Sequence, residues 1–398
     1  MRLRVSLRAR SPEETSEIAA ALMPALGIAG VTELTHLDRL ALPVFVSHRP
    51  GGKTLRMHAG KGLSEADARA GALMEALEYA VSERHSSAGV DLSLPLGDLA
   101  AALPRPLTLT DFAPRLGVAI DWASSIPAVR CEEIITGTNA LLPAELVLVP
   151  FEHPDAAPVF GWSSNGLASG NTLNEATLHA LFEVLERDAL AMNVAGDSSH
   201  RVSNASLPAP FRGLAAGWMR LGIELFVRFM PNALGLPCFE AAMHQPESRR
   251  LRMSRGWGLH FDRRIALARA VCEAAQVRLV SMRRRCYATE LPKAERLLAS
   301  LRSSRRAMTF EDVPHFTFWS VDSALKALLA LLGHEGFVHV FRRQMPLRID
   351  GLPRHELHVV KVVVPRCEFA SGAHMRMGPR LIERAFGKQS TTGKQIKR

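Results

Sequence analysis

Apolar residues recur at helical spacing in three long segments of this chain, and each segment also carries two polar residues three positions apart. On a helix, positions i and i+3 lie on one face, so each pair presents two oxygen-bearing groups in the same direction. Solvated helix faces are the plainer interpretation of any single pair. Burying several carboxylates together, however, costs too much free energy unless positive charge lies between them. The three pairs together therefore predict a site for hard divalent cations. The pairs are Glu75 and Glu78, Glu183 and Glu186, and Glu273 and Gln276.

A glycine-rich stretch precedes each of these helices, at residues 60 to 63, 161 to 172 and 256 to 260. In the second stretch, Thr172 and Glu175 have the pattern of a capping box, and Ser64 is a cap for the first helix. We predict helices from Glu65 to Ser82 and from Arg263 to Met282. Small residues let a ligand approach the backbone, and helix starts attract anions. The stretches match neither the P-loop nor the dinucleotide fingerprint, so a nucleotide site here would have another design.

Strand and helix patterns alternate along the rest of the chain without a regular βαβ period. This favours an α+β fold with helices packed on mixed sheets. We predict one domain over residues 1 to 386, with an N-terminal segment (1 to 55), a nucleotide-binding core (56 to 290) and a C-terminal subdomain (291 to 386). Residues 387 to 398 are polar and basic, which predicts a disordered tail. The further predicted helices are Pro12 to Leu26 and Lys293 to Ser303, and the predicted strands include Pro43 to Val46, Phe316 to Val321, Phe337 to Phe341 and Leu357 to Val364.

Composition narrows the class of protein. A hydrophobic content of 47% and a charged content of 22% are typical of globular proteins. No apolar run approaches the length of a membrane span, and no signal-peptide core follows Met1, so we expect a cytoplasmic protein with no membrane partner. The five cysteines have no CxxC spacing, which argues against a disulfide framework or a structural zinc site and favours small buried side chains.

The formal net charge of +10 raises the question of nucleic-acid binding. The chain has no recognised nucleic-acid motif, and aromatic residues make up only 6% of it, which leaves few platforms for base stacking. We therefore do not expect a nucleic-acid partner. Arginine clusters such as Arg283 to Arg285 more often cover solvated helix faces, or contact an acidic peptide or a partner protein.

The three motif segments resemble YcaO-domain proteins. The similar strings are residues 60 to 63 with 74 to 78, residues 164 to 172 with 185 to 189, and residues 273 to 278. Thr35 to Val44 and Val359 to Pro365 also lie where the family has comparable strings, so the resemblance covers nearly the whole chain. It implies a YcaO-like fold, ATP and Mg²⁺ as cofactors, and activation of peptide backbone amides by O-phosphorylation. A side-chain nucleophile then gives an azoline, and external sulfide gives a thioamide.

The resemblance also implies roles for individual residues. The metal ligands would be Glu75, Glu78, Glu183 and Glu186. The nucleotide site would contain Lys61, Asn165, Arg187, Glu273, Gln276 and Arg278.

The sequence departs from the family pattern at a few positions. Gly71 stands where the family usually has serine, Tyr79 where it has arginine, and Cys272 where it has threonine. These departures keep a second hypothesis open, a catalytically weak YcaO-like scaffold or peptide-binding partner. A metal-dependent hydrolase or ligase unrelated to the family is the third.

The end of the chain bears on the product and the partner. Azoline-forming members commonly end in a proline-rich tail, whereas the last proline here is Pro379 and the final residues are basic. This favours the thioamide-type or TfuA-associated branch. Because the chain shows no leader-peptide-binding domain, we expect a peptide or protein substrate that is captured with a TfuA-like or leader-peptide-binding partner protein. The sequence leaves a homodimer open.

Overall fold

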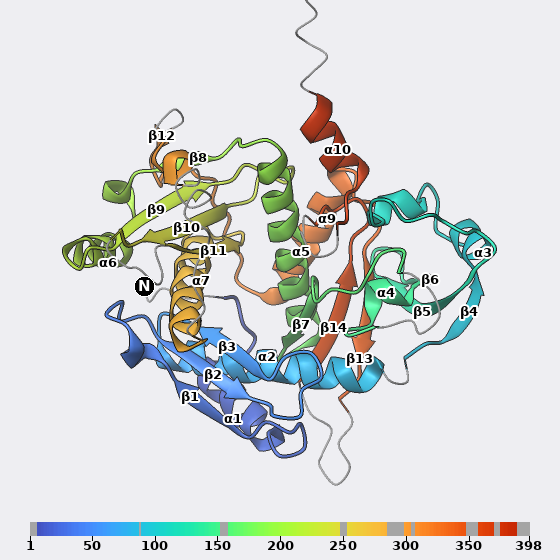
Figure 1. The fold of residues 1–398 in the computed structure, drawn as a ribbon, viewed down its shortest axis with the longest axis horizontal. Helices are drawn as coiled ribbons and strands as arrows, with labels where there is room; N and C mark the ends of the chain where they lie inside the picture. The colour runs from blue at the N-terminus through green and yellow to red at the C-terminus, as the bar shows by residue number, and fades with distance from the viewer. Residues whose placement is uncertain are drawn as a thin grey trace, which may run out of the picture.

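Three strand–helix units form the framework of the fold (Figure 1). The computed structural model describes residues 6–86, 89–151, 158–246, 253–284, 298–303, 307–347, 357–369 and 375–387. In each unit a short strand leads directly into a long helix. The units are β3 (Met57–Lys61) with α2 (Glu65–Ser86), β7 (Leu167–Gly170) with α5 (Leu173–Ala195), and β11 (Met253–Leu259) with α7 (Arg263–Arg284).

Each unit belongs to a different sheet, and its strand lies at the edge of that sheet. β3 follows β1 (Gly30–Glu33) and β2 (Val44–His48) in a three-stranded antiparallel sheet. β11 begins the order β11-β10-β9-β8-β12, with β10 (Cys238–His244), β9 (Glu224–Phe229), β8 (His200–Val202) and β12 (Ala307–Met308). β7 ends the order β4-β5-β13-β14-β7, with β4 (Leu92–Pro95), β5 (Ser125–Glu133), β13 (Phe341–Met345) and β14 (His358–Val363), and β6 (Thr138–Pro143) pairs with β5. The pairs within these sheets are antiparallel except β12 with β8, which is parallel.

Further helices of the described residues surround this framework. They are α1 (Pro12–Leu22), α3 (Leu96–Ala101), α4 (Ala144–Val147), α6 (Ala209–Arg220), α9 (Val321–His334) and α10 (Pro379–Phe386), with short 3-10 turns η1 (Thr35–Leu37), η2 (Leu109–Phe112) and η3 (Asn204–Ser206). None of the helices in the described part of the chain has both the length and the apolar character needed to cross a membrane.

A glycine in each unit's strand brings strand and helix into backbone contact. A Cβ atom at Gly60 would lie 1.9 Å from the carbonyl oxygen of Ala68 in α2. The corresponding Cβ atoms at Gly170 and Gly256 would lie 2.4 Å and 2.3 Å from backbone nitrogens of α5 and α7. No larger residue fits at these positions. All three glycine-rich stretches, residues 60 to 63, 161 to 172 and 256 to 260, therefore contain residues of packed strands.

Side-chain caps start the first two helices as predicted, but the capping box does not form. Ser64 Oγ accepts the Asp67 N–H at 3.2 Å, and Thr172 Oγ1 accepts the Glu175 N–H at 3.1 Å. The Glu175 carboxylate, which the box would direct back to the cap, instead accepts hydrogen bonds from the Ala9 N–H and from Asn171. A contact with the N-terminal segment, remote in sequence, has replaced the local one.

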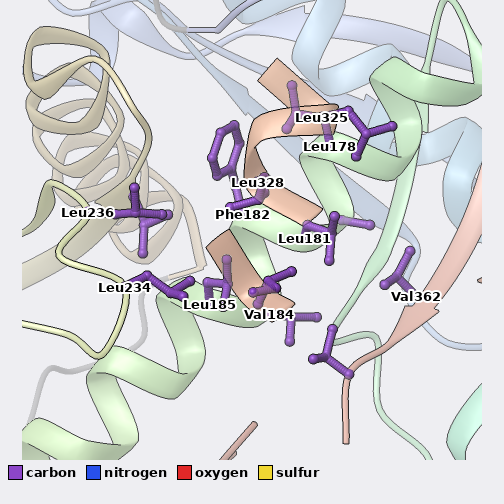
Figure 2. Packing of buried hydrophobic residues seen from close by; sticks show 14 of the residues in the cluster. Leu178, Leu181, Phe182, Val184, Leu185, Leu234, Leu236, Leu325, Leu328 and Val362 are labelled. Carbon is purple, nitrogen blue, oxygen red and sulfur yellow. The ribbon is translucent and has the colours of Figure 1, made fainter. Parts of the chain in front are cut away.

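One face of α5 is apolar and packs into a large core (Figure 2). This packing holds α5 between α9 and the sheet that contains β14. The opposite face of α5 is left to face the other two motif helices. Core residues on α5 include Leu178, Leu181, Phe182 and Leu185, which pack with Leu325 and Leu328 of α9 and Val362 of β14.

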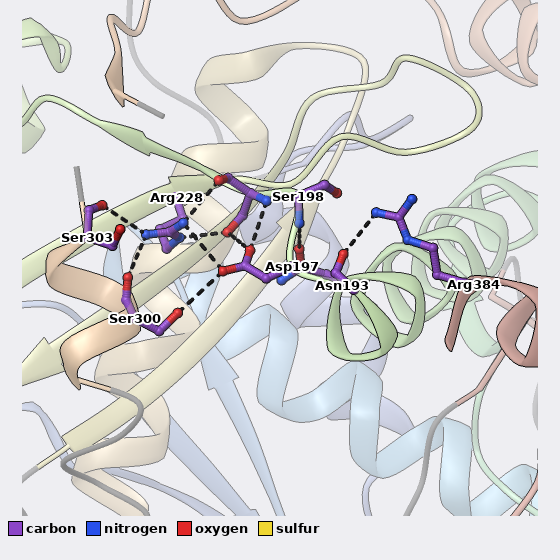
Figure 3. Close-up of polar contacts among 9 residues, drawn as sticks. Asn193, Asp197, Ser198, Arg228, Ser300, Ser303 and Arg384 are labelled. Carbon is purple, nitrogen blue, oxygen red and sulfur yellow. Dashed lines mark hydrogen bonds and ion pairs between the residues drawn. The ribbon is translucent and has the colours of Figure 1, made fainter. Parts of the chain in front are cut away.

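A buried arginine ties the second sheet to segments on either side of it (Figure 3). The Arg228 side chain on β9 is 5% exposed and donates hydrogen bonds to the carbonyl oxygens of Ser199, Ser300 and Ser303 at 3.0, 2.9 and 3.5 Å. It thereby links the segment after α5 to the short helical stretch at residues 298 to 302.

The α+β prediction is confirmed, and most predicted elements are present. The predicted strand at Phe316 to Val321 is wrong. There the Phe316 N–H bonds to the Phe261 carbonyl, the rings of Phe316 and Phe318 pack on Phe261, and α9 begins at Val321. The aromatic residues at positions 316 and 318 alternate along the chain because both pack on the ring of Phe261, and not because they belong to a sheet.

Other boundaries shift. The strand predicted at Phe337 to Phe341 begins only at Phe341, and the first helix ends at Leu22. Residues 388 to 398, Cys286, and residues 293 to 297 of the helix predicted from Lys293 lie outside the described residues, whereas residues 298 to 302 of that helix are helical as predicted. Cys131, Cys238 and Cys272 are buried and unpaired. The division into segments at residues 55 and 290 stays a prediction.

Candidate functional site

The three units are arranged as a ring around a cavity of about 340 Å³. Each helix packs against the strand of the next unit: α2 contacts β7, α5 contacts β11, and α7 contacts β3 (Figure 1). The polar pairs therefore face a common space. Eight of the ten predicted site residues line it, namely Lys61, Glu75, Glu78, Glu183, Glu186, Arg187, Glu273 and Gln276.

The first carboxylate of each acidic pair is held by its own unit. Glu75 Oε2 accepts the Ala59 N–H of β3 at 2.7 Å. Glu183 Oε1 accepts the Gly166 N–H, immediately before β7, at 3.3 Å. The donor comes from the strand β3 in the first unit and from the turn that leads into β7 in the second, and in both units it orients the carboxylate.

The second carboxylate of each pair is held by the next unit. Glu78 Oε1 accepts hydrogen bonds from the backbone N–H and the hydroxyl of Ser169 in β7, at 2.9 and 2.8 Å. Glu186 Oε2 accepts the Leu259 N–H of β11 at 3.2 Å. These contacts connect neighbouring units, so the same residues that give the cavity its charge also hold the ring together.

The third unit completes the ring differently. Glu273 on α7 forms an ion pair with Lys61 of β3, with 2.6 Å between Nζ and Oε2. Gln276 takes the second position of the pair, and its Oε1 is buried without a hydrogen bond from any described residue. The third unit thus contributes one neutralised carboxylate and one amide oxygen that is free to accept a hydrogen bond.

Burial opposes ionisation of the acidic groups in this cavity. It raises the pKa of Glu75 to about 7, and the carboxylates of Glu183 and Glu273 act in the same direction. It raises the pKa of Glu78 to about 8, with Glu75 and Glu183 adding to the effect. The pKa of Glu186 is raised as well, by burial and then by Glu273. Among the described residues, the cavity is therefore lined by more carboxyl groups than its basic side chains can neutralise.

Two cations offset part of this negative charge. Burial acts to raise the pKa of Glu273, but Lys61 and Arg187 lower it below its ordinary value. Burial acts to lower the pKa of Arg187, but the carboxylates of Glu186, Glu183 and Glu273 raise it. Arg187 and Glu273 are thus charged, and they lie beside carboxyl groups that exchange protons near neutral pH.

The structure does not bring two of the predicted residues into the cavity lining. Arg278 lies two positions beyond Gln276, hence on another face of α7, and it pairs with Asp38 and with Gln245. Asn165 lies in the turn before β7, with its Oδ1 buried and not hydrogen-bonded to any described residue. A ligand role for either residue stays a prediction.

Several cavity residues were not identified from the sequence. His179 and Arg269 lie four positions before Glu183 and Glu273, so extending each motif by one helical turn would have found them. Arg8 lines the cavity from the N-terminal segment, and no local pattern marks it. Burial lowers the pKa of Arg8 and lowers that of His179 to about 4.

The departures Gly71 and Tyr79 also lie at the site. Gly71 lines the cavity, and a Cβ atom there would lie 3.3 Å from the Cα of Gly60. The Tyr79 hydroxyl shares a hydrogen bond with the Ser164 side chain, and burial raises the pKa of Tyr79. The tyrosine therefore supports the turn before β7.

Comparisons with known proteins agree with this geometry. The model of the family described as "YcaO cyclodehydratase, ATP- and Mg²⁺-binding" matches residues 59 to 368. The chain is 33% identical over 285 residues to an uncharacterized protein of Mycobacterium tuberculosis, an alignment that covers 69% of this chain but only 62% of that relative. It is also 33% identical over 292 residues to an uncharacterized protein in the tfuA 3′ region of Rhizobium leguminosarum bv. trifolii, covering 69% of this chain and 67% of the relative.

A solved structure shares the fold. YcaO from Methanopyrus kandleri, bound with AMPPCP and Mg²⁺, superposes with a TM-score of 0.72 at 22% identity, over 94% of this chain and 96% of that one. The family match covers more than half of the chain and includes all three motif helices. As the resemblance predicted, the chain belongs to the YcaO family, which binds ATP and Mg²⁺.

Proposed function

We propose that this protein is an ATP- and Mg²⁺-dependent enzyme that activates a peptide backbone amide by phosphorylating its oxygen, and so installs a thioamide or an azoline. The observation that carries the proposal is the ring of five carboxylates from three helices, of which Glu186 is buried and the other four are half-buried, with the cations Lys61 and Arg187 lining the same cavity. An amide oxygen is a poor leaving group. ATP supplies the phosphate that makes it a good one, and Mg²⁺ neutralises phosphate oxygens.

The residues of the cavity fit a magnesium–nucleotide complex. Among the described residues, no three His, Cys, Asp or Glu side chains come close enough to hold a metal ion by themselves. Mg²⁺ in nucleotide sites is commonly held by one or two carboxylates, with phosphate oxygens and water completing the shell. A ring of separated carboxylates, with raised pKa values at Glu75, Glu78 and Glu186, suits that arrangement better than an all-protein metal cage would.

Each group of residues then has a part to perform. Glu75, Glu78, Glu183 and Glu186 would hold the metal. Lys61 and Arg187 would meet phosphate oxygens, because both are cations held at the cavity by Glu273 or its neighbours. Gln276 has a buried oxygen without a partner among the described residues and would accept a hydrogen bond from the ligand.

The product is the finer part of the proposal. We favour a thioamide made with a TfuA-like partner protein, supported by the relative in the tfuA 3′ region. The azoline alternative is supported by the family's description as a cyclodehydratase.

The test is to incubate the protein with ATP, Mg²⁺, sulfide and a candidate peptide encoded beside its gene, with and without the TfuA-like protein. Replacement of oxygen by sulfur in the peptide mass indicates a thioamide, and loss of one water indicates an azoline. A heavy-oxygen label in the target amide should appear in the released phosphate.

Label that stays in the peptide, or modification without ATP, would refute O-phosphorylation. Binding of ATP with Mg²⁺ but no turnover with any encoded peptide would instead favour the scaffold hypothesis. Metal-dependent cleavage or ligation without nucleotide would favour the unrelated hydrolase or ligase.

A further inference from the structure

A buried lysine on β14 contacts the turn that leads into β7. Lys361 is 3% exposed, and its Nζ donates hydrogen bonds to the carbonyl oxygens of Ser163 and Asn165 at 2.6 and 2.5 Å. No carboxylate among the described residues lies within ion-pair distance of Nζ. Lys361 does not line the cavity, and none of the predicted roles includes it. A buried lysine that binds only carbonyl oxygens is unusual, because desolvation of an ammonium group is costly and the compensation is small.

The turn that Lys361 contacts has a demanding geometry. The Leu167 N–H donates to the Ser164 carbonyl at 2.8 Å, which closes a β-turn with Gly166 at its third position. Gly166 has a φ of 80°, and a Cβ atom there would lie 2.3 Å from the Val362 carbonyl oxygen. A positive φ at this position is the mark of a type II turn, which requires glycine. A common alternative, type I, has the central peptide rotated the other way.

The central peptide of this turn lies between Lys361 and a cavity carboxylate. Its carbonyl oxygen, from Asn165, accepts the hydrogen bond from Lys361 Nζ, and its N–H, from Gly166, donates to Glu183 Oε1 at 3.3 Å. A cation at the oxygen end of an amide polarises it and strengthens the donor at the nitrogen end. Lys361, one peptide group and Glu183 thus form a continuous polar chain.

We propose that Lys361 is a positioning residue of the magnesium–nucleotide site: it holds the Asn165–Gly166 peptide in the orientation that directs the Gly166 N–H at Glu183. The inference rests on the proposed function only in giving Glu183 its role as a metal ligand. Without Lys361 the peptide can rotate, because nothing else among the described residues binds the Asn165 carbonyl. Glu183 would then lose its backbone donor and its fixed direction.

The test compares Lys361→Met, which removes the donors at similar length, with Lys361→Arg, which keeps the charge. The first measurement is hydrogen–deuterium exchange of peptides that cover residues 163 to 167, in protein without nucleotide or metal. We expect exchange of the Gly166 amide to accelerate at least about tenfold in Lys361→Met and to stay within about threefold of wild type in Lys361→Arg. If Lys361→Arg does not fold, Lys361→Gln serves as the donor-retaining variant.

The second measurement is calorimetric titration with a non-hydrolysable ATP analogue in the presence of Mg²⁺. We expect Lys361→Met to lower the affinity at least about tenfold, the value of one lost charge-assisted hydrogen bond. Arg228→Met is the matched control, because Arg228 is also a buried cation that binds backbone carbonyls but lies outside the cavity lining (Figure 3). It should lower the melting temperature and leave the affinity unchanged.

Unchanged exchange at residues 163 to 167 in Lys361→Met would overturn the proposal, as would unchanged affinity. Equal losses of affinity in Lys361→Met and Arg228→Met, in proportion to their losses of stability, would show a merely structural role and would overturn it too. Failure of the proposed function would look different. Wild type would then modify no peptide, while the exchange and binding differences between the variants would persist.

Discussion

Replacing Glu78 by glutamine should stabilise the metal-free protein while weakening magnesium–nucleotide binding. Glu78 accepts both of its hydrogen bonds, from the Ser169 N–H and hydroxyl, on Oε1. A glutamine oxygen can accept the same two bonds, so the substitution removes charge and little else. Burial raises the pKa of Glu78 from 4.5 to about 8, which corresponds to an unfavourable free energy of up to about 5 kcal/mol for the ionised form.

The sign of the pH dependence follows from this raised pKa. Between pH 4.5 and about 8 the folded protein holds a proton on Glu78 that the unfolded chain has lost, so stability falls as the pH rises through this range and is level above it. Glu78→Gln removes that loss. The difference in free energy of unfolding between variant and wild type should therefore be small at pH 5 and reach at least about 2 kcal/mol at pH 8.5, after a discount for the unpaired amide of glutamine.

The assay is urea denaturation with a metal chelator at both pH values, followed by calorimetric titration with a non-hydrolysable ATP analogue and Mg²⁺. Glu145→Gln is the matched control. Glu145 is also a buried carboxylate, but it accepts the N–H groups of Val159, Phe160 and Gly161 at 3.1, 2.7 and 2.6 Å, away from the cavity. An amide cannot accept all three, so this control should lose stability and keep its affinity. A Glu78→Gln protein that is less stable than wild type at pH 8.5, or that binds nucleotide normally, would refute the reasoning.

Three further predictions concern the same cavity. Affinity for magnesium–nucleotide should rise from pH 6 to about pH 8.5 and level off above, because Glu75 and Glu78, with pKa values of about 7 and 8, must lose protons to bind metal. Calorimetric titrations in buffers of different ionisation enthalpy should detect the released protons, and an affinity that does not change with pH would contradict this prediction. Glu183→Ala with Glu186→Ala should cost at least about 3 kcal/mol of nucleotide binding free energy in the same titration, and tight binding by this double variant would exclude both as metal ligands. Gly71→Ser with Tyr79→Arg should tighten nucleotide binding, since an arginine there would lie among Glu75, Glu78 and Glu183. The melting temperature should fall, because a Cβ at residue 71 crowds the Gly60 Cα at 3.3 Å and the Tyr79–Ser164 hydrogen bond is lost. No gain in affinity would mean that Tyr79 and other groups already compensate for the loss of the usual residues.

The sequence predicted the acidic part of the site well because that part is local. The spacing of Glu75 with Glu78, and of Glu183 with Glu186, places each pair on one helical face whatever the rest of the fold does. Glu273 and Gln276 follow the same rule, and Arg278 fails it, since a residue two positions further on turns to another face. The helix geometry that supported the first prediction therefore also explains why Arg278 does not line the cavity, and a ligand role for Arg278 stays a prediction.

Two of the cations around the site, Arg8 and Lys361, could not be predicted in the same way because they come from remote segments. Arg8 reaches the cavity from before the first helix, and Lys361 acts from a strand almost 200 residues after the turn that it contacts. Neither position has a local pattern that distinguishes it from an ordinary surface cation. The ring of units is equally invisible in the sequence, because it depends on which edge strand each helix meets.

The departures from the family pattern also change meaning once the fold is known. Read as isolated positions, Gly71 and Tyr79 look like losses of polar contacts to a nucleotide. In the structure, Gly71 allows β3 to approach α2, and Tyr79 shares a hydrogen bond with Ser164 in the turn that Lys361 also contacts. That turn supplies the backbone donor of Glu183. A tyrosine at position 79 therefore contributes to the site by supporting a carboxylate and not by contacting phosphate, so the substitution by itself is weak evidence for a catalytically inactive scaffold.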